Sequence, residues 1–214
     1  MKHTLLICFL ILSFSSVLFS QEDTTKPADK ELFVWGGISF PYLPREFNDF
    51  WKNGWNIGGG YGYSFEPGSI GYGALHATVE YARFAFDSAG VSSTIRAIDT
   101  TYKNLTSTGR PTSIFDVMLQ FKGAFSTTKQ SVAPYFLLGI GYMFYSAGSV
   151  TVSGDTSFVL DKQQKSKFLW SVGVGIEIPF SESLGMFVQA KSILGVIDPT
   201  RQYFPLSAGI MIRP

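Results

Sequence analysis

The feature that most constrains this chain is a two-residue alternation of apolar and polar side chains that recurs in eight separate segments. Successive side chains of a β-strand point to opposite faces, so this period predicts strands rather than helices. After residue 30, no apolar run reaches the roughly 18 residues that a membrane-spanning helix requires. The segments are Glu31–Phe40, Trp55–Phe65, Ile70–Phe86, Thr112–Phe125, Ala133–Ala147, Lys167–Phe180, Leu184–Ile197 and Tyr203–Arg213.

The connections between these segments alternate in length. The long ones are Pro41–Gly54, Asp87–Pro111 and Gly148–Ser166, and the short ones include Glu66–Ser69, Ser126–Val132 and Ser181–Ser183. An up-and-down barrel in an outer membrane has short periplasmic turns and longer external loops. We therefore predict an all-β fold, an eight-stranded antiparallel up-and-down transmembrane β-barrel with the three long connections outside the cell.

The alternation alone does not say which face is external, because a soluble carrier barrel has the same period with an apolar interior. Two observations favour the membrane. The polar face is rich in glycine, as at Gly58, Gly60 and Gly62, and small residues suit the narrow lumen of an eight-stranded barrel. Charged residues are 15% of the chain, against roughly 25% in an ordinary soluble domain. We therefore expect the apolar face to meet lipid.

The first residues have the three-part plan of a secretory signal peptide. A short basic start precedes an apolar run from Leu5 to Phe19, and the chain then turns polar. We predict a signal peptide at residues 1–20, a polar lead at 21–30 and the barrel at 31–214. The single cysteine, Cys8, excludes a disulfide framework. Lys and Arg number 17 against 16 Asp and Glu, which excludes a nucleic-acid binder.

The chain resembles the small outer-membrane β-barrel domain family, which includes OmpX-like barrels and the OmpA transmembrane domain. The resemblance rests on the glycine–aromatic texture of FVWGGISFPYLP, FNDFWKNGWNIGGGYGYSFEPGS and the closing YFPLSAGIMIRP. It implies residence in the outer membrane of a Gram-negative-type bacterium, contact with outer-membrane lipid and insertion by the barrel-assembly machinery. We expect a monomer.

If each strand turns its apolar face outward, three acids and three bases point into the lumen. These residues are Glu80, Asp116, Lys122, Glu177, Lys191 and Arg213, and His76, Thr78, Gln120 and Gln189 share their face. We interpret them as a polar plug of ion pairs and hydrogen bonds, because side chains fill a barrel this small. The alternative is an ion pathway or a cation site at Glu80 and Asp116. We predict no cofactor and no metal.

Three functions remain open. The leading one is a structural, adhesive or surface-interaction role, with any extracellular ligand bound by loops 41–54, 87–111 and 148–166. The second is a lipid-modifying hydrolase that would use His76, Thr78 and Glu80, although their parity points inward. The third is a narrow pore.

Two further groups are interpreted at the external end. The alternation places Arg83 on the outer face of its strand. There its guanidinium group can contact lipid headgroup phosphates, or the side chain can extend along the wall so that its charge reaches water. Phe47, Phe50 and Trp51 in the first loop form either a binding patch or, as we expect, a cap on the barrel rim.

Overall fold

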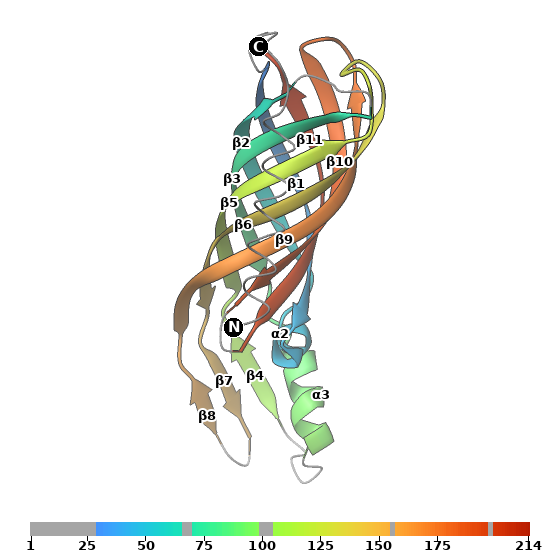
Figure 1. Ribbon diagram of the computed structural model, residues 1–214. Helices are drawn as coiled ribbons and strands as arrows, with labels where there is room; N and C mark the ends of the chain where they lie inside the picture. The colour runs from blue at the N-terminus through green and yellow to red at the C-terminus, as the bar shows by residue number, and fades with distance from the viewer. Residues whose placement is uncertain (1–28, 66–69, 99–104, 155–156, 197–198) are drawn as a thin grey trace.

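The computed structural model describes residues 29–65, 70–98, 105–154, 157–196 and 199–214. Eight long strands form a closed barrel in the order β1-β11-β10-β9-β6-β5-β3-β2, with every neighbouring pair antiparallel (Figure 1). They are β1 (Asp29–Leu43), β2 (Gly54–Ser64), β3 (Tyr72–Phe84), β5 (Thr112–Ala124), β6 (Ala133–Ala147), β9 (Gln163–Pro179), β10 (Leu184–Gly195) and β11 (Arg201–Ile212). This confirms the predicted fold class. Closure leaves no free strand edge, which is what a β-structure in lipid requires.

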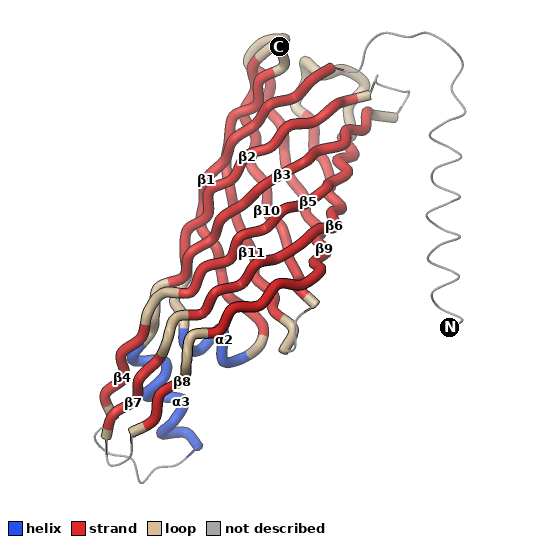
Figure 2. The backbone as a smooth tube through the Cα atoms, turned by 90° about the vertical axis from the view of Figure 1, so that its left-hand side faces the viewer, coloured by secondary structure: helices blue, strands red, loops and turns tan. Residues whose placement is uncertain are grey.

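The two ends of the barrel differ. β1 begins and β11 ends at the same end, where Leu32 pairs with Ile212. The tight turns 125–132 and 180–183 also lie there, and we call it the turn end. At the opposite end, the loop end, two helices and a small sheet project beyond the barrel wall (Figure 2).

Those projecting elements correct our reading of the long connections as plain loops. The connections contain α2 (Arg45–Phe50), α3 (Ser88–Ile98), β4 (Thr106–Gly109), β7 (Val150–Ser153) and β8 (Phe158–Leu160). The last three strands pair as a second sheet in the order β4-β7-β8. Strands of three or four residues are too short to show alternation. The helical period of α3 is present in the sequence, with Val91, Ile95 and Ile98 at i, i+4 and i+7, but sequence reasoning missed it. No helix of the described chain is long and apolar enough to cross a membrane.

Several strand bounds also differ from the sequence prediction. β1 starts at Asp29, inside the predicted polar lead, and β9 starts at Gln163 rather than at Lys167. These additions are polar residues paired through the backbone, as where Gln163 pairs with Ala147, and backbone pairing leaves no trace in the hydropathy pattern. The predicted signal peptide, most of the lead and the turn Glu66–Ser69 lie outside the described residues.

The strands turn their apolar side chains outward. Val174 is 63% exposed and Ile140 55%, whereas the alternate residues on each strand are buried in the lumen. The glycines of the inner face make room for aromatic rings: a Cβ at Gly58 would stand 2.3 Å from the ring of Trp35. The lumen is thus filled by large side chains of one strand that lie over the glycines of the next.

The loop end of the lumen is closed by an apolar cluster. Phe47 of α2 is fully buried and packs its ring against Phe84, with ring centroids 5.0 Å apart. Trp51 is also buried, and Phe50 packs against the same cluster. The aromatic residues of the first loop therefore cap the barrel.

Candidate functional site

The candidate site is the polar interior of the barrel. Every charged or amide side chain that the sequence placed in the lumen lies there, between 0% and 7% exposed. These residues are His76, Glu80, Asp116, Gln120, Lys122, Glu177, Gln189, Lys191 and Arg213. They form a cluster at the turn end, a second cluster near mid-barrel and a layer of amides between them.

The turn-end cluster is built on two glutamates. Lys122 Nζ lies 2.5 Å from Glu177 Oε2, and Arg213 pairs with the other oxygen of Glu177. Glu31 accepts from Arg213 Nε at 3.2 Å and contacts His76 Nε2 at 2.9 Å. Residues from four strands, namely β1, β3, β5 and β9, are thus tied to the end of β11.

The mid-barrel cluster is built on Glu80. Its carboxylate pairs with Lys191 and accepts a hydrogen bond from Trp35 Nε1 at 3.1 Å. Gly58 lies between Glu80 and Trp35 in the strand register, so its lack of a side chain lets the indole reach the carboxylate. Asp116 is the direct register partner of Glu80, and Tyr203 donates to it at 2.5 Å. The ammonium group of Lys191 thus occupies the position beside Glu80 that a bound cation would need.

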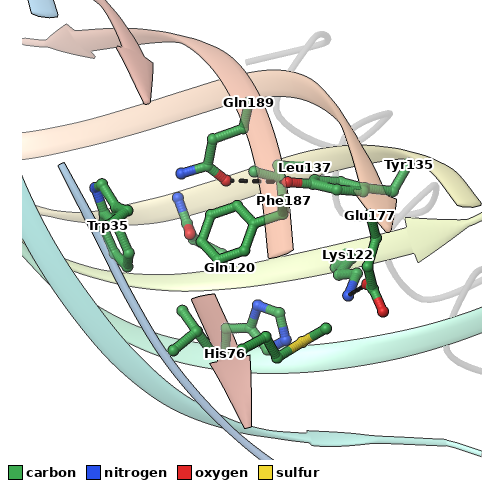
Figure 3. Close-up of a pocket in the computed structure, with 11 residues that line it drawn as sticks. Trp35, His76, Gln120, Lys122, Tyr135, Leu137, Glu177, Phe187 and Gln189 are labelled. Atoms are coloured by element: carbon green, nitrogen blue, oxygen red, sulfur yellow. Dashed lines mark hydrogen bonds and ion pairs between the residues drawn. The ribbon is translucent and has the colours of Figure 1, made fainter. Parts of the chain in front are cut away.

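The amide layer lies between the two clusters. Gln120 donates to Ser171 Oγ at 3.5 Å. Tyr135 donates to Gln189 Oε1 at 3.3 Å (Figure 3). The cavity among these side chains has a volume of about 20 Å³. Such a volume holds about one water molecule.

Sequence reasoning missed Glu31, which is fully buried in the turn-end cluster. Its position at the end of its segment made it look like part of the strand terminus. Leu32 and Val34 both face outward, and Glu31 alternates with them along the strand, so this pattern would have placed Glu31 in the lumen. Sequence reasoning also missed Arg201, which is buried at the loop end over the ring of Tyr145. With Glu31 and Arg201 added, the described lumen residues comprise four acids and four bases, so their formal charges still sum to zero.

Sequence reasoning also missed the lumenal hydrogen-bond donors Trp35, Tyr72 and Tyr203. Tyr72 donates to Glu177 at 3.1 Å. These aromatic residues each carry one polar atom, so their parity was the only signal of an inward position.

The three residues of the hydrolase hypothesis face the lumen but do not bond to one another. His76 contacts Glu31, Thr78 donates weakly to the carbonyl oxygen of Met118 at 3.5 Å, and Glu80 pairs with Lys191. Arg83 lies apart from all of them, exposed on the outer wall near the loop end. Within the described ranges, no group of three or more His, Cys, Asp or Glu side chains is arranged to hold a metal ion.

Comparison with known proteins defines the class. The chain belongs to the outer membrane protein β-barrel domain family, whose model matches residues 12–192. It is therefore an outer-membrane barrel of a Gram-negative-type bacterium, in contact with outer-membrane lipid. No curated protein sequence matches it.

Similar solved structures include one with a TM-score above 0.5. Neisserial surface protein A is 12% identical, with 88% of this chain and 100% of that chain covered and a TM-score of 0.52. The N-terminal β-barrel domain of Pseudomonas aeruginosa OprF is 12% identical, with coverage of 88% and 100% and a TM-score of 0.46. The outer membrane enzyme PagL is 13% identical, with coverage of 86% and 99% and a TM-score of 0.44. At 12% identity, the likeness to Neisserial surface protein A concerns the fold alone.

Proposed function

We propose that this protein is a plugged, non-conducting barrel that works as a membrane anchor for a surface-interaction role, structural or adhesive. The observation that carries the proposal is the ion-pair network of the lumen. Lys122, Lys191 and Arg213 each pair with a buried glutamate. A buried charge without a partner is costly, so the pairing favours a filled lumen over an open water path.

The loop end is the part that would interact. α2, α3 and the β4-β7-β8 sheet extend beyond the barrel there (Figure 2), and the aromatic cap beneath them closes the lumen. We infer that this end faces the cell exterior, because long connections of such barrels lie outside and short turns face the periplasm. An extracellular ligand would then bind residues 41–54, 87–111 or 148–166. We expect the barrel to act as a monomer inserted by the barrel-assembly machinery.

Planar-bilayer recording of the purified protein tests the plug. We expect most insertions to give no stable current, because side chains fill an eight-stranded lumen. The double variant Glu80→Ala with Lys191→Ala removes the mid-barrel pair and should give conducting events more often. Heat-modifiable gel migration verifies that both proteins are folded. Steady open-channel currents from most insertions of the unmodified protein would refute the plug.

A further inference from the structure

A second pocket lies on the outer wall of the barrel at the loop end, where β3, β5 and β6 approach their ends. Its volume is about 360 Å³. The lining side chains that matter here are Arg83, Arg110, Lys162, Ser113, Ser146 and Ser149. The pocket is separate from the lumen, because Ser113 and Arg83 are on the outward face of their strands.

The charge of this pocket is of one sign. Three of its lining side chains are cations, and its described lining includes no acid. Within the described residues, none of Arg83, Arg110 and Lys162 forms an ion pair with a carboxylate. Lys122, Lys191 and Arg213 in the lumen, by contrast, each pair with a glutamate. The pocket thus offers positive charge and hydroxyl groups for an anion.

The chain holds this pocket in a fixed geometry. Arg83, Ser113 and Ser146 are register partners in one row across β3, β5 and β6. The amide of Arg110 donates to the carbonyl oxygen of Ser149 at 3.1 Å, which joins the two segments that enter the small sheet. A Cβ at Gly148 would lie 2.4 Å from Arg110 Cβ, so only glycine permits this close crossing.

The position of the pocket along the membrane normal follows from the row of aromatic side chains beside it. The next outward row toward the turn end is Tyr81, Phe115 and Phe144, about 7 Å further along the strands. The rings of Phe115 and Phe144 lie 6.1 Å apart, and both side chains are exposed on the wall. Rows of exposed aromatic rings mark the membrane–water interface of such barrels. The pocket therefore lies at the level of the lipid headgroups.

We propose that this pocket binds the phosphate ester of a lipid headgroup in the leaflet at the loop end. Guanidinium groups match phosphate oxygens with two parallel hydrogen bonds, and a lysine adds a point charge. The serine hydroxyls supply further donors. The assignment does not depend on whether the lumen conducts.

The test places the protein in nanodiscs of phosphatidylcholine mixed with phosphatidic acid and identifies the retained lipid by native mass spectrometry. The unmodified protein should retain phosphatidic acid in preference to phosphatidylcholine. The triple variant Arg83→Gln, Arg110→Gln, Lys162→Gln should lose this preference by on the order of a hundredfold, because each cation at an anionic surface contributes roughly a fivefold factor. The control triple variant Lys30→Gln, Lys52→Gln, Lys167→Gln removes the same charge from exposed positions outside the pocket lining and should keep the preference.

Competition with inorganic phosphate distinguishes a lipid from a free anion. If phosphate displaces phosphatidic acid only at a large excess, the lipid headgroup is the ligand. If phosphate alone binds the unmodified protein and phosphatidic acid is not enriched, the lipid assignment is wrong. An equal loss of preference in the two triple variants would overturn the site, because general surface charge would then account for the binding.

Discussion

Replacement of Lys191 by Met tests the buried pairing most directly. Lys191 is 2% exposed and its ammonium group pairs with Glu80, which is 1% exposed. The thioether side chain fills a similar volume but carries no charge. After the change Glu80 and Asp116, which face each other in the strand register, would share a buried site without their cation.

The size of the expected stability loss depends on the interactions that Glu80 retains in Lys191→Met. Loss of one partner of a buried ion pair costs about 3–5 kcal/mol. Glu80 retains the hydrogen bond from Trp35 Nε1 at 3.1 Å, so we expect a loss of stability near the lower end, about 3 kcal/mol. The double variant Lys191→Met with Glu80→Gln removes both charges and should recover about 1–3 kcal/mol of that loss.

The assay is urea-induced unfolding in lipid vesicles, with the folded fraction measured by heat-modifiable gel migration. Arg45→Met is the control, because the Arg45 side chain is 86% exposed and pairs with Asp49 at 3.2 Å on α2. A surface pair of this kind contributes about 0–1 kcal/mol. If Lys191→Met costs no more than Arg45→Met, water already solvates the mid-barrel charges and the argument for a plug fails.

Two further predictions concern the lumen glycines and the orientation. Gly58→Ala should destabilise the barrel by about 1–3 kcal/mol in the same unfolding assay, because the new Cβ would meet the Trp35 ring at 2.3 Å. Gly36→Ala is the control, since its Cβ has no neighbour nearer than 3.6 Å. Equal losses of stability in the two variants would contradict the packing argument. A cysteine placed at Ser157, at the loop end, should react with an impermeant reagent on whole cells, while one at Thr127, at the turn end, should not. Background labelling is not expected, because Cys8 is the chain's only cysteine and lies in the predicted signal peptide. The reverse labelling would invert the orientation.

The sequence by itself determined the barrel. Alternation in segments such as Thr112–Phe125 assigns each side chain to one face of a strand. A chain with this period, few charges and no helix-length apolar run has few ways other than a closed barrel to pair its backbone N–H and C=O groups in lipid. The same parity identified Glu80, Lys191 and most of the other inward charges. The face of a strand that a side chain occupies follows from the alternation of its neighbours along the chain, so it can be read directly from the sequence.

Tertiary structure decided which of these residues meet. Whether Lys191 pairs with Glu80 or with Asp116 depends on strand register and on which rings fill the lumen, and neither is a property of one segment. The buried position of Glu31 beside Arg213 follows from barrel closure, which joins β1 to β11. The pocket of Arg83, Arg110 and Lys162 likewise exists only where three distant segments cross. Contacts of this kind are set by closure and register, because residues far apart in the chain share no local pattern.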